Sequence, residues 1–443
     1  MDAPEKGRLS AGAGEPRWKV YACLALLLAA LAVVVGPKVR LLHWQVEPGG
    51  NTALDEALQW RRGNLALSHR FYESARAGEK YYNVTGLAFT LVSVAATTLT
   101  DAGALLCRRL GCAGDAAAFP APLYIALVAL PLPIIAFYAF RGVMKDSPWA
   151  AVLAFYLIAG TALTHVLGVC QGGSIYYINH VLAVVGLLIF AADLLGRRRL
   201  WPAAIGLCLA AWSRQMTILY ALPLLWAAWR AGTTQLEAQA DAARSADADT
   251  PPPVSSARRR AAFALLGMAV AVGVPALLNT LKFGSPFESG YTRLYEGRTD
   301  RIGRRAQEAV FGMRYIPMHA RAMNTAYPCW DVRKSTPYAD TADMNGGSIW
   351  LTSPILLGVF VTWRRWWRDP ARRALMLGTL PVIFGLMCYH TTGADGSGCY
   401  RYSLDFIPVW LLVIAPYILT HRGNLLTVAC LAYSTAYFYY LPP

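Results

Sequence analysis

Long apolar stretches constrain the fold of this chain more than any other feature of its sequence. About eleven to twelve such segments, most of them roughly 20 residues long, divide the 443 residues. A helix needs about 20 apolar residues to cross the hydrocarbon core of a bilayer, and only helices and closed barrels satisfy their backbone hydrogen bonds in lipid. The sequence therefore predicts an all-α fold, a polytopic bundle of transmembrane helices in the lipid bilayer.

Charge supports a membrane location and argues against nucleic acid as a partner. Only 15% of the residues are charged, compared with about 25% in soluble domains. The formal net charge of +15 comes mostly from short arginine clusters beside the apolar segments, such as 197–199, 258–260 and 364–365. Such clusters mark the cytoplasmic ends of membrane helices. No stripe of alternating basic and aromatic residues and no nucleic-acid-binding motif accompanies this charge.

The nine cysteines predict no metal site. No pair among them has the C-x-x-C spacing that is typical of zinc sites. Cys329 and Cys399 both fall in segments that we expect outside the membrane, so they could form a disulfide if that side is oxidising.

Alternating spans give the chain an orientation. Residues 1–19 are polar and basic and lack a cleavage pattern, so we expect a cytoplasmic tail followed by one transmembrane domain over 20–443. The arginine clusters share the cytoplasmic side with 231–260, whose composition is typical of a flexible linker. The long polar segments 37–84 and 281–348 then become outer loops on the extracytoplasmic side, and we expect them to carry short helices.

Segment 86–106 does not fit this alternation. If it crosses the membrane, Arg141 and Lys145 move to the extracytoplasmic side, against the usual charge distribution. Thr97 and Thr98 also make the segment polar for a helix that faces lipid. We therefore favour a re-entrant or peripheral hairpin that does not span the membrane, with a local failure of the charge rule as the alternative.

Acidic residues in the first outer loop are candidates for catalysis. Asn51 or Thr52 could cap a helix over 53–62, which would place Asp55 and Glu56 in its first turn. There the two acids either complement the helix dipole or deprotonate the hydroxyl of an acceptor. Glu47 is a further acid of the same loop.

Basic and ionisable residues at the ends of apolar segments are candidates for binding an anion. His180 lies at the mouth of a span, where an ionisable group is a functional candidate, or it is a histidine hydrogen-bonded between helices. Arg214 lies in a tight turn, where it either holds an anion or extends toward the interface. Arg401 lies where a lipid phosphate would bind, or it orders its loop by pairing with Asp405.

Several motifs resemble one family of membrane enzymes. They are Gly63-Asn64-Leu65 with Lys80-Tyr81-Tyr82, Phe283-Gly284-Ser285-Pro286-Phe287-Glu288-Ser289-Gly290-Tyr291, and Tyr400-Arg401-Tyr402 with Asp405 and Pro408. They occur in the order found in bacterial membrane glycosyltransferases of the GT-C superfamily, and the sequence is similar to dolichyl-phosphate-mannose-protein mannosyltransferases (glycosyltransferase family 39-like). The resemblance implies a hexosyltransferase of the bacterial inner (plasma) membrane. Such an enzyme moves a sugar from a polyprenyl-phosphate donor to an envelope acceptor on the extracytoplasmic face.

The resemblance also implies roles for individual residues. In this family an acid of the first outer loop acts as base or orients the acceptor, but here that position falls near Asn51, an amide. Asp55, Glu56 or Glu47 would then take the role. The donor already carries a phosphate leaving group, so neither a metal nor a cofactor is expected. The candidates for binding substrate or phosphate are Asn51, His180, Arg214, Lys282, Tyr291, Arg293, Arg401 and Tyr402.

Two other functions remain open at this stage. A transporter or flippase of an amphipathic lipid-linked substrate is one, although the sequence shows no clear internal repeat and no matching pair of broken helices. A non-catalytic relative that binds lipid carriers is the other, and the amide at Asn51 is its best support.

Overall fold

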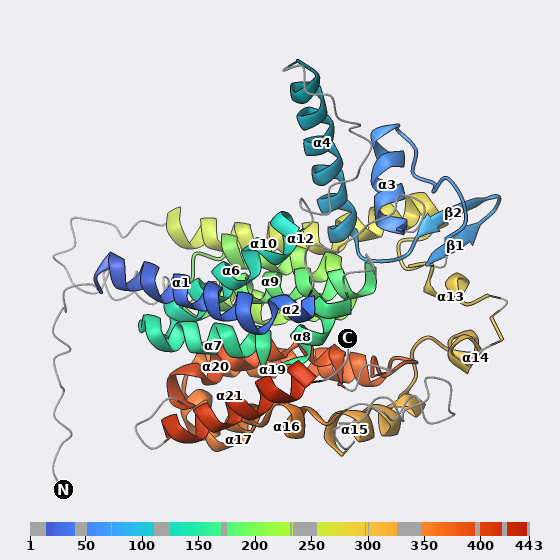
Figure 1. The fold of residues 1–443 in the computed structure, drawn as a ribbon. Coiled ribbons are helices and arrows are strands. Elements are labelled where there is room, and N and C mark those ends of the chain that lie inside the picture. The colour runs from blue at the N-terminus through green and yellow to red at the C-terminus, as the bar shows by residue number, and fades with distance from the viewer. Residues whose placement is uncertain are drawn as a thin grey trace, which may run out of the picture.

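Helices make up most of the structure (Figure 1). The computed structural model describes residues 15–39, 51–71, 73–109, 125–169, 175–230, 233, 255–296, 298–299, 301–325, 347–394, 399–418 and 423–440. Glu47, Cys329 and most of the linker 231–260 lie outside these residues, so the predictions for them are not tested.

The elements follow one another in a simple order. The first half contains α1 (Arg17–Val34), α2 (Gly36–Val39), α3 (Thr52–Arg61), β1 (Ser74–Ala77), β2 (Lys80–Asn83), α4 (Leu87–Arg109), the π-helix η2 (Ile125–Ala129), α6 (Pro131–Met144), α7 (Ser147–Ala159), α8 (Ala162–Val169), α9 (Ile175–Leu195), α10 (Trp201–Ser213), the 3₁₀ helix η4 (Gln215–Tyr220) and a helix over 221–230. The second half contains α12 (Ser255–Phe283), α13 (Tyr291–Leu294), α14 (Arg301–Glu308), η5 (Met313–Tyr315), α15 (Ile316–Asn324), α16 (Ile349–Thr352), η7 (Pro354–Leu357), α17 (Gly358–Val361), α18 (Trp363–Arg368), α19 (Pro370–Met387), η8 (Arg401–Asp405), α20 (Ile407–Ile418) and α21 (Gly423–Tyr440).

The candidate membrane spans identify a multi-pass membrane protein. Within the described residues, five helices are long and apolar enough to cross a bilayer, and the bent pair α7 and α8 makes a sixth. The five are Arg17–Val34, Leu87–Leu105, Leu127–Met144, Tyr177–Leu195 and Arg258–Phe283. This number is smaller than the eleven to twelve segments expected, because several apolar segments fold as shorter pieces. Segment 349–363, for example, is interrupted by the 3₁₀ helix at Pro354.

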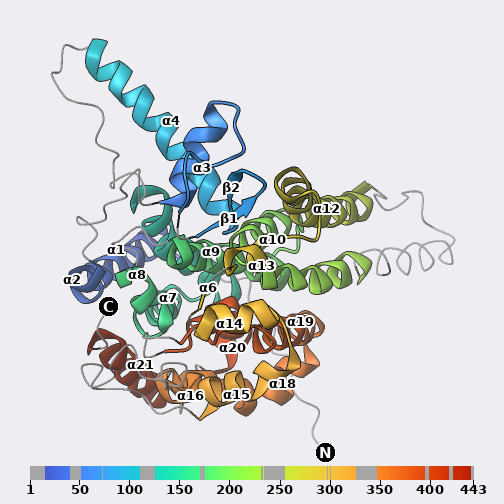
Figure 2. The same ribbon diagram turned by 90° about the vertical axis from the view of Figure 1, so that its right-hand side faces the viewer.

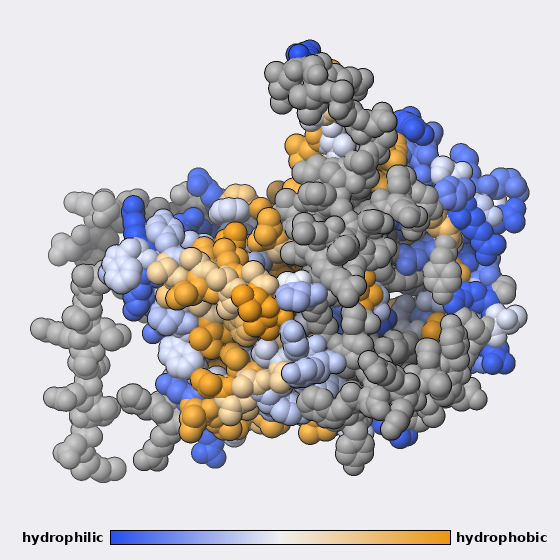
Figure 3. All heavy atoms as spheres, viewed as in Figure 1, coloured by the Kyte–Doolittle hydropathy of each residue, from blue (hydrophilic) through white to orange (hydrophobic). Residues whose placement is uncertain are grey.

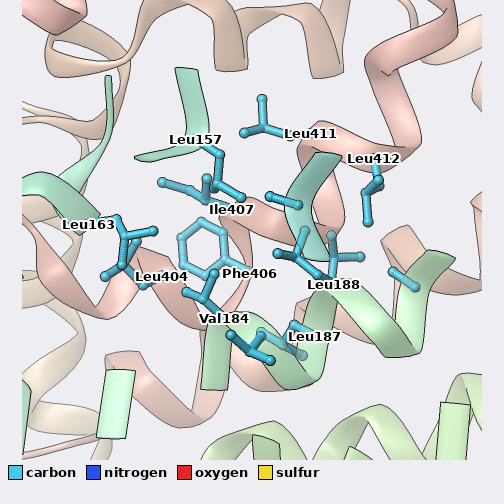
Figure 4. Close-up of a cluster of buried hydrophobic side chains, with 14 of the residues drawn as sticks. Leu157, Leu163, Val184, Leu187, Leu188, Leu404, Phe406, Ile407, Leu411 and Leu412 are labelled. Atoms are coloured by element: carbon cyan, nitrogen blue, oxygen red, sulfur yellow. The ribbon is translucent and has the colours of Figure 1, made fainter. Parts of the chain in front are cut away.

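Helix α9 forms the centre of the bundle. Its apolar window is 83% buried inside the protein, whereas the windows of α1 and α12 are 17% buried and leave most of their surface for lipid. Side chains of α7, α8, α9 and the segment 404–412 interdigitate around Phe406 (Figure 4). Non-directional packing of this kind holds the helices together where lipid offers the same apolar environment.

An apolar surface lies between two hydrophilic ends. Figure 3 shows hydrophobic residues gathered over the bundle, with hydrophilic residues at its left edge and over the domain on the right. That distribution is what a helical bundle in a bilayer requires, because water solvates only its two ends.

A small outer domain covers one end of the bundle (Figures 1 and 2). Strands β1 and β2 pair antiparallel with Ser74 opposite Asn83, and α13 and α14 pack beside them. A second hydrophobic core joins these elements and contains Ala75, Val84, Leu294, Tyr295 and Ala306. Segments 37–84 and 281–348 therefore do carry short helices, and the described parts of both contribute to this domain.

Helix α4 projects away from the bundle in both views, crosswise to α1 and α9 (Figures 1 and 2). Its residues Leu87–Leu105 meet the length and composition of a span. If α9 runs along the membrane normal, however, α4 has the direction of a helix that lies along the membrane interface. The segment forms one continuous helix and not the hairpin that we expected, and its location outside the membrane core remains a prediction.

Two glycines allow α9 and α10 to touch backbone to backbone. A Cβ on Gly206 would lie 2.5 Å from the carbonyl oxygen of Gly186, and a Cβ on Gly186 would lie 2.6 Å from the carbonyl oxygen of Gly206. We expect Gly206→Ala to lower the free energy of unfolding by about 1–3 kcal/mol, because the two helices must separate. Gly273→Ala is the control, since a Cβ on Gly273 meets nothing within 4 Å. The free energy of unfolding, measured in detergent, should not fall for Gly273→Ala. An equal decrease for Gly206→Ala and Gly273→Ala would contradict the close contact between the two helices.

Candidate functional site

A buried ion pair joins two distant parts of the chain at the end of the bundle. Arg214 follows the last residue of α10 in extended conformation, and Asp405 ends the 3₁₀ helix η8. The guanidinium Nε donates to both carboxylate oxygens at 3.2 Å, and Nη2 donates to Oδ2 at 3.1 Å. Asp405 is fully buried, and the Arg214 side chain is 19% exposed. Burial raises the pKa of Asp405, and the neighbouring Arg214 opposes that rise.

His180 and Tyr402 pack against this ion pair. Nδ1 of His180 lies 3.7 Å from Oδ1 of Asp405, and the imidazole stacks on the Tyr402 ring with the centroids 6.0 Å apart. The guanidinium carbon of Arg214 lies 4.8 Å from the centroid of the Tyr402 ring, and that of Arg401 lies 5.5 Å from it. Arg401 also lies over the Tyr177 ring, at 5.3 Å. Two cations therefore share one aromatic ring.

Loop residues hold the Tyr402 ring in place. Its hydroxyl forms a hydrogen bond of 2.8 Å with Oγ1 of Thr391. Gly393 adopts a positive φ of 65°, and a Cβ there would lie 2.6 Å from the ring, so a larger residue would displace it. The neighbouring Tyr400 hydroxyl bonds to Nδ1 of His319 at 2.8 Å. The ring is thus fixed before any ligand arrives.

A second carboxyl group, that of Glu73, acts electrostatically on a residue of the cluster. Glu73 immediately precedes β1, and its Oε2 atom is buried without a hydrogen-bond partner among the described residues. Burial raises its pKa to about 8. Glu73 also acts electrostatically on Tyr291, whose pKa burial raises to about 12 and which interacts with Arg214 and Tyr402. Glu73 is therefore coupled electrostatically to Tyr291, which itself interacts with Arg214.

The cluster contains two arginine side chains. Arg214 and Arg401 are cations, and Asp405 is the carboxylate that pairs with one of them. Glu73, with a pKa of about 8, is mostly protonated at pH 7. Arginine guanidinium groups bind anions such as phosphates through paired hydrogen bonds, so the two arginines make this cluster a candidate site for an anionic ligand.

Glu56 is engaged in a separate polar cluster of the outer domain. Its carboxylate accepts from Lys282 Nζ at 2.5 Å, from Asn83 Nδ2 at 2.7 Å and from Thr90 Oγ1 at 2.6 Å. Glu56 and Lys282 are both buried. Because each of these charges already has its counter-ion, the contact fastens α3, the hairpin and α12 to one another.

Asp55 and Asn51 also form local contacts. The Asp55 carboxylate accepts from the backbone N–H of Ser68 at 2.7 Å and from its hydroxyl at 2.8 Å. Oδ1 of Asn51 accepts from the backbone N–H of Leu54 at 3.0 Å, which confirms that Asn51 caps the helix. The helix covers 52–61, one residue earlier than expected at each end.

The chain segment 83–86 connects the two clusters. Lys282 donates to the carbonyl oxygen of Asn83 at 3.0 Å. Three residues later, a Cβ on Gly86 would lie 2.5 Å from the carbonyl oxygen of Trp212 and 2.6 Å from that of Ser213. The outer domain is therefore seated directly on the end of α10, next to Arg214.

An apolar groove of about 870 Å³ runs along the bundle toward the same point. It lies between the first turns of α4, the length of α10 and the middle of α12. Its wall includes Trp201 near one end of α10 and Trp212 at the other, two residues before Arg214. The indole N–H of Trp212 is buried and has no partner among the described residues. A long apolar ligand in the groove would thus reach the charged cluster with its polar end.

The structure brings together part of the set that the sequence predicts. His180, Arg214, Tyr291, Arg401 and Tyr402 gather around the ion pair. The other described candidates lie in the outer domain: Asn51, Asp55, Glu56, Lys282, and Arg293, which packs over Phe283 with its guanidinium carbon 5.6 Å from the ring centroid. No group of three or more histidine, cysteine, aspartate or glutamate side chains among the described residues could hold a metal ion.

Sequence analysis missed Glu73 and the actual partner of Asp405. An acid that follows the aromatic pair Phe71-Tyr72 and precedes a hairpin is a weak signal, because nothing in the sequence marks it as buried. The sequence suggests Asp405 as a partner of Arg401, whereas in the structure Asp405 pairs with Arg214, 191 positions away.

Comparison with known proteins identifies no relative of this chain. Neither the family models, nor the curated proteins, nor the solved structures give a match to this sequence. The resemblance to GT-C glycosyltransferases therefore remains a prediction from the sequence motifs.

Proposed function

We propose that this chain is a GT-C-like glycosyltransferase that moves a sugar from a polyprenyl-phosphate donor to an envelope acceptor. The observation that supports it best is the position of the apolar groove, whose wall at Trp212 lies two residues from Arg214. A polyprenyl phosphate has a long apolar chain and one anionic end. The apolar groove matches the chain, and the cluster around Arg214 matches the anionic end. Arginine suits the phosphate because its planar guanidinium donates two parallel hydrogen bonds.

The proposal assigns roles to the residues of the cluster. Arg401 and Arg214 bind the donor phosphate and stabilise the negative charge that develops on it. Asp405 orients Arg214, and Tyr402 keeps both guanidinium groups in place. The Trp212 indole N–H donates a hydrogen bond to the lipid phosphate or to the sugar.

Glu73 is our candidate for the base. The acceptor oxygen attacks the anomeric carbon of the sugar, the bond from that carbon to the phosphate oxygen breaks, and the electron pair leaves with the phosphate. The acceptor proton passes to the Glu73 carboxylate. We assign Glu56 a structural role instead, because Lys282, Asn83 and Thr90 already occupy its oxygens.

The proposal includes an orientation of the chain in the membrane. The arginines 197–199 precede α10 and Arg214 follows it, so the two lie at opposite ends of this helix. If the arginine cluster is cytoplasmic, the candidate site and the outer domain face the extracytoplasmic side.

The test is transfer by the purified chain in proteoliposomes with a radiolabelled polyprenyl-phosphate hexose. We expect Ile205→Trp, which fills the groove, to weaken donor affinity roughly tenfold, equivalent to about 1.4 kcal/mol. Leu265→Trp is the matched control, since Leu265 is similarly exposed on α12 but does not line the groove. Donor binding without transfer would support a non-catalytic carrier-binding protein, and uptake of the intact donor would support a transporter.

A further inference from the structure

A second groove lies at the end of the bundle that carries the arginine clusters. It has a volume of about 270 Å³ and separates the helix over 221–230 from α19. Trp226 and Arg373 stand near one end, and Leu377 and Pro381 line it further along α19. Because a helix rises about 1.5 Å per residue, the stretch from Arg373 to Pro381 extends about 12 Å into the apolar part of the bundle. One end of the groove is therefore cationic and the rest is apolar.

Arg373 is available to a ligand at the cationic end. Its guanidinium carbon lies 5.6 Å from the centroid of the Trp367 ring, and it forms no ion pair with a carboxylate of the described residues. The neighbouring acid, Asp369, is already engaged, because it pairs with Arg372 and caps α19 through the N–H groups of Ala371 and Arg372. The local charge at the groove is thus positive.

The surroundings of the groove have the composition of a membrane interface. Helix α18 has the sequence Trp-Arg-Arg-Trp-Trp-Arg, and Trp363 and Trp367 are 50% and 42% exposed. Tryptophan and arginine are the residues that occupy the head-group level of a bilayer. The groove is lined by Leu222, Pro223 and Trp226 of the helix over 221–230, and it shares no lining residue with the groove proposed for the donor.

We propose that this groove binds an anionic phospholipid of the bilayer. Arg373 holds the phosphate of the head group through paired hydrogen bonds, and one acyl chain lies along Leu377 and Pro381. Gly378 fixes the depth of the groove, because a Cβ there would lie 2.7 Å from the Pro223 ring and would force the two helices apart. Charge complementarity selects the occupant, since a zwitterionic lipid brings its own cation close to Arg373. This proposal is independent of the proposed enzymatic function.

Native mass spectrometry of the full chain in detergent tests the proposal with phosphatidylglycerol and phosphatidylcholine as probes. We expect phosphatidylglycerol to bind the wild type about tenfold more tightly, and Arg373→Gln to remove that preference. Ala374→Phe should weaken both lipids, because it fills the groove without changing its charge. Arg304→Gln, an exposed arginine of α14 in the outer domain, should behave as wild type.

Thermal unfolding of each variant checks that it is folded before its lipid binding is compared. A preference for phosphatidylglycerol that persists in Arg373→Gln would overturn the proposal, as would equal binding of the two lipids to the wild type. Inorganic phosphate at the same concentration should leave the lipid bound, and displacement by phosphate would mean that the groove recognises a free anion instead.

Discussion

Asp405→Ala is expected to abolish transfer and to lower the free energy of unfolding by about 3–5 kcal/mol. The substitution leaves the Arg214 guanidinium in a mostly buried position without the carboxylate that accepts its three hydrogen bonds. Under the proposed function, Arg214 also loses its orientation toward the donor phosphate. Chemical unfolding in detergent micelles measures the first effect, and the donor assay measures the second.

A matched surface pair provides the control for this effect. Asp101 pairs with Arg61, but its side chain is 64% exposed, so Asp101→Ala should change the free energy of unfolding by less than about 1 kcal/mol. The double variant Arg214→Met with Asp405→Leu should recover much of the lost stability, because apolar residues of similar size often replace a buried pair without loss. It should remain inactive. Full transfer activity of this double variant would show that the ion pair is not required for the reaction.

The class of fold could be predicted from the sequence because hydropathy depends on residue types alone. Within the described residues, five helices are long and apolar enough to cross a bilayer, and the bent pair α7 and α8 makes a sixth. The ends of the helices were harder to predict. The segment over 349–363 breaks at Pro354, and α7 meets α8 at an angle of 56°, in each case through local backbone geometry that hydropathy does not record.

The candidate site could be predicted only in part, for a physical reason. His180, Arg214 and Arg401 stood out because a charged or titratable residue at the end of an apolar segment is unusual. Their partners depend on tertiary packing. The contact between Glu56 and Lys282 joins residues 226 positions apart. Glu56, which the sequence suggests as a general base, is therefore paired with a cation in the structure.

Glu73→Gln is expected to reduce the rate of transfer by about 10²–10⁴-fold, the usual contribution of a general base. Only the ionised carboxylate can accept the acceptor proton. Because burial raises the pKa of Glu73 to about 8, the wild-type rate should increase with pH and level off above about 8. The variant should lose this dependence. Glu79→Gln is the control, since Glu79 lies in the same hairpin and its side chain is 92% exposed.

Stability gives an independent measurement of the same group. The pKa of Glu73 is higher in the folded chain than its ordinary value of 4.5, so the folded state binds the proton more tightly than the unfolded state. Between these two pKa values the wild type should therefore lose stability as the pH rises, by at most about 1.4 kcal/mol per pH unit. Glu73→Gln should lack this slope and become the more stable protein near pH 8. Parallel unfolding curves for both proteins from pH 5 to 8 would show that Glu73 is solvated, and it could then not serve as the base that we propose.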